Sequence, residues 1–244
     1  MKNINLNRKK FEYNPVSATI NGEFITPGLE GRVVLKYPSY KKMMRYGNYN
    51  EKLFVFKNVV PKKTINNYYL KYINRARSGK NRVAFIYTVA GNNDIDNILK
   101  ILNDNNTHVT FFVDGLFLNN NIDTINNIIN QSHQVEILSY DNSYNEVYFK
   151  NSIRLLESIK NSKSLFCYSD YKNKKLLDLC RLNKLHTVIP TINIKNNLFI
   201  DIKNNLSDGL LIKMPNNTLE LAVTISYIKQ RGYLIDTLEN ILSE

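Results

Sequence analysis

Short apolar runs alternate with segments at helical spacing from residue 82 to the end of the chain. The first run, residues 83–87, lacks polar alternation, which is typical of a strand buried on both faces. Ile95, Ile98 and Leu102 follow it at the spacing of one helix face. The same pattern predicts strands at 109–113, 135–138, 165–167, 187–189, 210–212 and 233–235, and helices at 122–129, 147–159, 176–180, near 206, 218–231 and 238–242.

Repeated strand–helix units predict an α/β fold in which helices cover a parallel sheet. Seven such units fit a closed or nearly closed barrel. An open, doubly wound sheet is the structural alternative, and periodicity does not distinguish the two.

Residues 1–80 are irregular, with glycines and prolines spaced through them. We expect a short helix at 40–46, capped by Ser39 and ended by Gly47, a strand at 53–56, and a polar linker at 75–82. The predicted organisation is therefore an N-terminal extension, 1–80, followed by a barrel domain, 81–244.

The chain carries a formal net charge of +12. Paired lysines are scattered along it, and the abundance of Asn, Lys, Ile and Tyr is typical of AT-rich coding. We therefore attribute the charge to composition, although an anionic polymer or a nucleic acid stays an alternative partner. No apolar stretch reaches the roughly 18 residues of a membrane span.

Two cysteines, Cys167 and Cys180, form neither a CxxC pair nor a disulfide framework, and their apolar neighbours predict buried free thiols. No leader segment follows Met1. We therefore expect a cytoplasmic protein, or one of the cell envelope if a leader or anchor is missing. The sequence also lacks the common nucleotide-binding, serine-hydrolase and zinc-protease motifs.

Four segments resemble the polysaccharide deacetylases of the NodB type. Residues 110–115 (TFFVDG) are similar to that family's ATFFVTG, and residues 133–142 (HQVEILSYDN) to its GHEIGNHSYNH. Residues 83–87 are similar to the start of VALTFDDG, and residues 228–238 to the family's terminal motif. Residues 1–80 show a looser similarity to deacetylase-like proteins of spore-forming bacteria. The resemblance implies a distorted (β/α)7 NodB-type barrel with an irregular N-terminal extension.

Members of that family hydrolyse acetyl groups on glycans, using a divalent metal held by one aspartate and two histidines. The resemblance places the family's base aspartate at Thr88 and its metal aspartate at Val89. Its two metal histidines fall at Leu138 and Asn142, its positioning arginine at Cys167, and its acid histidine near Met214. Every catalytic position is therefore altered, which predicts a pseudoenzyme without catalytic residues, metal or cofactor.

The three histidines give independent support for this interpretation. His108, His133 and His186 each lie just before a predicted strand, at the mouth opposite to the one where such barrels build active sites. We expect them to be capping or packing residues.

Polar side chains follow the predicted strands at the other mouth. Tyrosines with amide and carboxylate neighbours suit sugar binding, because a ring stacks on a pyranose while polar groups bind its hydroxyls. The predicted ligand-binding residues are Asp114, Tyr140, Asp141, Asn142, Tyr168, Asp170, Asn193 and Lys213.

The leading hypothesis is an inactive deacetylase-like protein that binds a glycan or serves as a scaffold in the cell envelope, with a link to sporulation. Peptidoglycan, another glycan or an envelope protein is the expected partner, and nucleic acid is disfavoured. An active metal-dependent deacetylase with an altered site is the enzymatic alternative, with Asp94, Asp114 or Asp141 as improvised ligands.

Overall fold

The computed structural model describes residues 1–91, 94–194 and 197–244. These residues form two compact units. The first unit comprises Met1–Thr19, Pro27–Asn67 and Glu244, and the second comprises Ile20–Thr26 and Tyr68–Ser243. Residues 20–26 and 68–80, which the sequence assigned to the extension, thus belong with the barrel residues.

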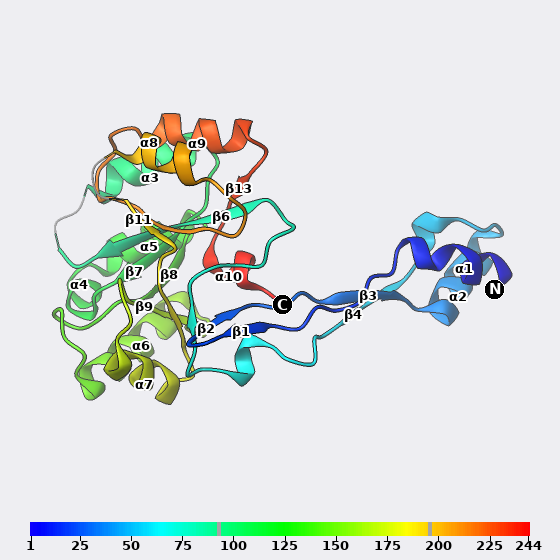
Figure 1. Ribbon diagram of the computed structural model, residues 1–244, viewed down its shortest axis with the longest axis horizontal. Helices are drawn as coiled ribbons and strands as arrows, with labels where there is room; N and C mark the ends of the chain where they lie inside the picture. The colour runs from blue at the N-terminus through cyan, green and yellow to red at the C-terminus, as the bar shows by residue number, and fades with distance from the viewer. Residues whose placement is uncertain (92–93, 195–196) are drawn as a thin grey trace. The chain divides into compact units, whose positions relative to one another are not determined.

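A curled sheet forms the centre of the second unit (Figure 1). Its order is β1-β2-β5-β10-β9-β8-β7-β6-β12-β11, with β13 paired to β6. The predicted α/β fold with a curled parallel sheet is confirmed. The strands are β1 (Thr19–Asn21), β2 (Phe24–Thr26), β5 (Tyr72–Ile73), β6 (Arg82–Val89), β7 (Thr110–Val113), β8 (Gln134–Ile137), β9 (Phe166–Tyr168), β10 (His186–Val188), β11 (Ile192–Asn193), β12 (Leu211–Lys213) and β13 (Leu234–Ile235).

Amphipathic helices cover this sheet. In α3, Ile98 and Leu102 pack into a continuous core with one face of β6, including Phe85 and Val89. Helix α3 contacts α9, and α9 contacts α8, and the three lie together in Figure 1. The helices of the second unit are α3 (Ile95–Asp104), α4 (Gly115–Asn120), α5 (Ile122–Asn130), α6 (Glu146–Lys160), α7 (Lys174–Leu182), α8 (Leu198–Asn205), α9 (Leu221–Gln230) and α10 (Leu238–Leu242).

Three strands of the sheet, β1, β2 and β5, come from the part of the chain that looked irregular. β5 pairs with β10 in parallel, and β2 pairs with β5. Both are too short to produce an apolar pattern, so only the pairing partner identifies them. The expected linker is also anchored, because the Asp208 carboxylate accepts hydrogen bonds from the backbone N–H groups of Gly79, Lys80 and Arg82.

The first unit contains a two-stranded antiparallel ribbon and two α-helices that contact each other (Figure 1). Its core is small, consisting of Ile4, Val34, Met43 and Phe54. The ribbon is β3 (Gly31–Val34) and β4 (Phe56–Val59), the α-helices are α1 (Lys2–Asn7) and α2 (Lys36–Tyr46), and short 3-10 helices span Arg8–Lys10, Glu51–Leu53 and Ile65–Asn67.

Two local predictions for this unit are wrong. Helix α2 begins at Lys36, so Ser39 lies inside it, where its buried Oγ accepts a hydrogen bond from Val55 N–H at 2.9 Å. Leu53 ends a 3-10 helix, and the strand begins only at Phe56. In both places tertiary packing overrides the local pattern.

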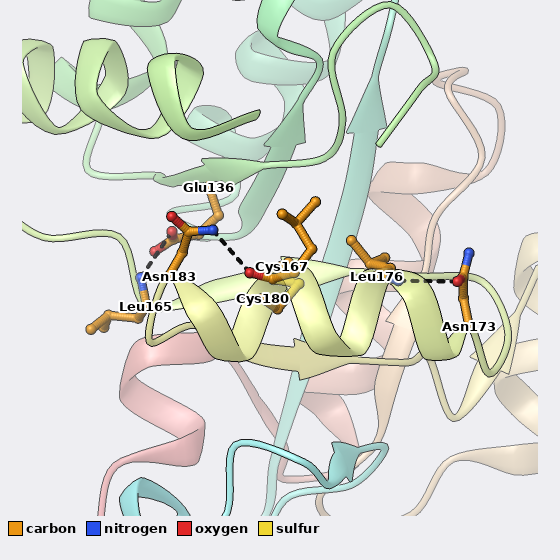
Figure 2. The surroundings of a disulfide bond; sticks show 8 residues. Glu136, Leu165, Cys167, Asn173, Leu176, Cys180 and Asn183 are labelled. Carbon is orange, nitrogen blue, oxygen red and sulfur yellow. Dashed lines mark hydrogen bonds between the residues drawn. A yellow bond between two sulfur atoms is a disulfide. The ribbon is translucent and has the colours of Figure 1, made fainter. Parts of the chain in front are cut away.

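The prediction of free thiols is also wrong. Cys167 in β9 and Cys180 in α7 form a disulfide, with their Cα atoms 6.3 Å apart (Figure 2). A strand and the helix that follows it bring the two residues together, although they are 13 positions apart. Sequence spacing alone gives no sign of this, because it does not show which face of the helix meets the strand.

Candidate functional site

The positions carried over from the deacetylase motifs gather at the carboxyl ends of the parallel strands. Thr88 and Val89 end β6, Leu138 follows β8, and Met214 follows β12. Cys167 lies in β9, in register with Ile137 of β8. The fold therefore brings these altered positions to the end of the barrel where active sites of this architecture are built.

The side chains at these positions do not fit a divalent metal. Val89 is 1% exposed and packs in the core beneath the helices, and Leu138 is a second hydrocarbon. Asn142 supplies one neutral amide, a weak donor beside the imidazoles and carboxylates that hold catalytic metals. Among residues 1–91, 94–194 and 197–244, no group of three or more His, Cys, Asp or Glu side chains could hold a metal ion.

Asp114 organises the neighbouring turn. Asp114 is 2% exposed, and its carboxylate caps α4 by accepting a hydrogen bond from Leu116 N–H at 2.9 Å. It also accepts hydrogen bonds from Ser139 Oγ at 2.5 Å, Asp141 N–H at 2.9 Å and Asn142 N–H at 3.2 Å. With four donors from its own chain, this carboxylate has a structural role in place of the ligand contact predicted from the sequence.

The turn that Asp114 holds contains Asn142, one of the altered metal positions. Asp141 and Asn142 have φ angles of 48° and 54°, and Tyr140 and Ser143 exchange backbone hydrogen bonds across them. Two successive positive φ angles define a tight hairpin turn, and Asp and Asn are the non-glycine residues that tolerate this backbone best.

Gly115 explains the Asp-Gly pair of the TFFVDG segment. A Cβ atom on Gly115 would lie 2.0 Å from Ser152 Oγ of α6. Only glycine therefore allows α6 to approach the start of α4 this closely.

A second polar group lies on β9 and β12. Tyr168 is buried, and its hydroxyl donates a hydrogen bond to Asp170 Oδ1 at 2.7 Å. Lys213 Nζ donates to the same oxygen at 2.7 Å and lies 5.7 Å from the centre of the Tyr168 ring. Burial and the Asp170 carboxylate raise the pKa of the Tyr168 hydroxyl, so this group acts as a hydrogen-bond donor.

Known proteins identify the architecture. No protein-family model matches the chain. The uncharacterized protein YlxY of Bacillus subtilis strain 168 is 25% identical over 257 residues, which cover 96% of this chain and 81% of YlxY. The crystal structure of a wild-type pseudoenzyme of carbohydrate esterase family 4 from Bacillus anthracis matches with a TM-score of 0.77 and 21% identity, covering 100% of this chain and 94% of that one. The structure of a mutant of the peptidoglycan deacetylase PdaC from Bacillus subtilis matches at 0.57 and 16%, covering 67% and 90%.

The chain has the fold of carbohydrate esterase family 4. The resemblance inferred from the four sequence motifs is thereby confirmed. At these identities the likeness establishes the fold alone.

Within this family 4 fold, the structure divides the predicted ligand residues into separate groups. Tyr168, Asp170 and Lys213 form the hydrogen-bonded group described above, and Asn193 is exposed on β11 in register with Lys213. Tyr140 stacks on Tyr148, with ring centres 4.8 Å apart.

One further residue of this mouth escaped the sequence prediction. Burial, with contributions from Tyr171 and Asp170, raises the pKa of Tyr144, which places this tyrosine in the electrostatic surroundings of the Tyr168–Asp170–Lys213 group. The sequence could have indicated Tyr144, because it lies two residues after Asn142 in the same loop.

Two histidines of this chain, His133 and His186, lie at the amino ends of the strands, as predicted. His133 precedes β8 and His186 begins β10, and both are 4% exposed. Burial, with a smaller contribution from His108, lowers the pKa of His133 to about 4, and burial lowers that of His186 to about 4. Glu136, 1% exposed, pairs with Lys160 at 3.3 Å, and burial raises its pKa.

The aspartates proposed for an altered metal site do not form one in this fold. Asp94 is exposed and accepts a hydrogen bond from Asn97, Asp114 is buried, and Asp141 is exposed in the turn. None belongs to a group of metal-competent side chains within the described part of the chain.

Proposed function

We propose that the protein is a catalytically inactive carbohydrate-esterase-like protein that binds a glycan at the carboxyl ends of its strands. The chemistry of three positions carries the proposal: Val89, Leu138 and Asn142 stand where the family motifs place an aspartate and two histidines. Hydrocarbon side chains offer no lone pair to a metal. Val89 and Leu138 therefore cannot hold the metal ion that would activate a water molecule.

The similar structures support this proposal. A neighbour with the same fold over the whole chain is described as a pseudoenzyme, and a mutant of it as having restored enzymatic activity. Another neighbour is a peptidoglycan deacetylase. A barrel of this kind therefore exists without catalysis and belongs to a group whose members act on glycans.

The Tyr168–Asp170–Lys213 group is the proposed contact region for the sugar. Asp170 and Lys213 keep side-chain exposures of 40% and 22%, so both heads reach solvent while their mutual contact positions them. A partly exposed carboxylate and ammonium beside tyrosines can bind the hydroxyl and acetamido groups of a glycan.

The cell envelope, with a link to sporulation, is the proposed setting. The Cys167–Cys180 disulfide supports an envelope location, because disulfides persist mainly in oxidising compartments. The link to sporulation rests on the similarity to proteins of spore-forming bacteria alone.

Two measurements test the function. Acetate release from N-acetylglucosamine oligomers, assayed with added Zn²⁺, should stay at the blank level. Binding of the same oligomers by calorimetry should be detectable and should weaken about 10-fold in Lys213→Gln, the loss of one charge-assisted hydrogen bond. Lys203→Gln, an exposed lysine of α8, is the matched control. Enzymatic turnover would overturn the inactive assignment, and binding unaffected by Lys213→Gln would overturn the proposed contact region.

The variant Thr88→Asp/Val89→Asp/Leu138→His/Asn142→His sharpens the first measurement. If the base position Thr88 and the metal positions Val89, Leu138 and Asn142 alone explain inactivity, this variant should bind Zn²⁺ and release acetate with Cys167 and Met214 unchanged. A variant that folds, binds Zn²⁺ and remains inactive would show that other parts of the mouth have also changed.

A further inference from the structure

The positive charge of the protein is concentrated in the first unit. This unit contains 61 residues, with 13 Lys and Arg against 4 Asp and Glu, which gives a net charge of +9 out of the total +12. The second unit, three times longer, accounts for the remaining +3. The expectation that lysines and arginines are evenly scattered was therefore wrong. Their positions along the chain do not show which of them belong to the same folded unit.

Within the first unit, the charge gathers on one end, which we call the basic tip: residues 1–10 and 36–49. The basic tip contains eight Lys and Arg residues and no Asp or Glu. Helices α1 and α2 contact each other there. Lys9, Lys10, Lys36, Lys41, Lys42 and Arg45 are all exposed.

Large apolar side chains stand exposed among these cations. Leu6, Tyr37, Met44 and Tyr46 are between 62% and 71% exposed. Lys41 Nζ lies 5.7 Å from the centre of the Tyr37 ring. Isolated exposed apolar residues are common on proteins. A group of four on two short contacting helices is instead typical of a surface that binds an apolar partner.

A pocket of about 250 Å³ opens on the same basic tip. Met1, Ile4, Met43, Met44 and Tyr49 supply its apolar walls, and Lys2 also lines it. Ile4 and Met43 belong to the small core of the unit, so the apolar interior is continuous with this opening. The pocket gives an apolar group a place to enter beside positive charge.

We propose that the basic tip binds the surface of a bilayer containing anionic lipids. The lysines and arginines attract the headgroups, while Leu6, Met44 and the tyrosines insert at the level where headgroups meet acyl chains. This combination favours a bilayer over a soluble polyanion. In a nucleic acid, phosphates pair with cations and bases stack on tyrosines, but neither group provides an apolar contact for the exposed Leu and Met side chains. The proposal is independent of glycan binding by the second unit.

Vesicle co-sedimentation of the full chain tests this proposal. The protein should partition onto phosphatidylcholine vesicles that contain about 30% phosphatidylglycerol and should not partition onto phosphatidylcholine alone. Lys41→Gln/Lys42→Gln/Arg45→Gln should lower the partition coefficient about 100-fold, since each basic residue near an anionic surface contributes about 5-fold. Met44→Ser/Tyr46→Ser should lower it about 10-fold.

Matched controls make the outcome decisive. Lys150→Gln/Lys174→Gln/Lys203→Gln removes three exposed charges from the second unit and should leave partitioning within 2-fold. All the substituted side chains are exposed, and circular dichroism checks that each variant is folded. Equal partitioning onto neutral vesicles would overturn the proposal. It would also be overturned if the Met44 and Tyr46 substitutions had no effect on vesicles while heparin bound and released with salt, because the surface would then bind polyanions.

Discussion

Two groups of ionisable residues, near opposite ends of the parallel strands in the second unit, differ in their exposure to solvent. Near the amino ends, His133 and His186 are each 4% exposed, and Glu136, within β8, is 1% exposed. At the carboxyl ends, Asp170 and Lys213 remain partly in solvent. Buried ionisable groups make stability sensitive to pH, whereas partly exposed pairs contribute little to stability and stay available to a ligand.

This difference separates the scaffold from the site. A pocket of about 480 Å³ does open at the amino ends, lined among others by His133, Lys160 and Glu239. In barrels of this architecture, however, chemistry and binding concentrate at the opposite end. The comparison predicts that changes at the amino ends alter stability, and that changes to the exposed pair at the carboxyl ends alter binding.

The largest expected effect is acid destabilisation from the amino ends. His133 and His186 have a pKa of about 4 in the folded protein and 6.5 when unfolded. Their neutral forms therefore support folding fully above pH 6.5, and this support is lost as the pH falls from 6.5 through 4. Between pH 7 and pH 5 the free energy of unfolding should fall by about 4 kcal/mol, measured by urea denaturation.

His133→Leu should remove about half of this pH dependence, which separates the histidine contribution from that of other groups. Glu136 acts in the opposite direction, since its raised pKa favours the folded state as the pH falls. An unchanged slope in His133→Leu would contradict the assignment of this histidine.

Asp114→Ala tests the buried carboxylate at the carboxyl ends. It removes the acceptor of four hydrogen bonds and should lower the free energy of unfolding by about 3 kcal/mol. The matched control is Asp141→Asn, an exposed residue whose replacement tolerates the same backbone, and it should change stability by under about 0.5 kcal/mol. Equal stability of both variants would mean that Asp114 does not hold the turn.

Removal of the disulfide should have a comparable or slightly smaller effect. Cys167→Ser/Cys180→Ser should lower the free energy of unfolding by about 2–3 kcal/mol, because the bond closes a short loop of the unfolded chain. Thiol titration of the denatured protein, prepared without reductant, should detect no free thiol. Two free thiols per chain would contradict the bond between β9 and α7.

The smallest expected effect on stability comes from the exposed pair. Lys213→Gln breaks its contact with Asp170, in which both side chains are partly exposed, and should change the free energy of unfolding by under about 1 kcal/mol. Its effect on glycan binding should exceed its effect on folding. A large loss of stability would place Lys213 with the scaffold and weaken the comparison between the two ends.

The sequence predicted the alternation of strands and helices because apolar runs and helical spacing are local patterns. It placed the strand residues of 83–87 and the buried face of α3 correctly. The short strands β2 and β5 could not be found this way, because two or three residues carry no period and gain their identity from β10. Likewise, the residue types at Val89 and Leu138 showed that metal ligands are missing. Only the fold showed that the Asp114 carboxylate accepts hydrogen bonds from Leu116 and from residues 139–142.

By itself the sequence determined which chemistry the chain lacks, since a hydrocarbon side chain offers no lone pair in any fold. It also determined the parallel α/β architecture, through periodicities that each segment expresses alone. Only the tertiary structure decided which residues meet: Cys167 with Cys180, Asp170 with Lys213, and the cations of residues 1–10 with those of residues 36–49. Contacts between distant positions depend on how elements pack, and no local pattern records that packing.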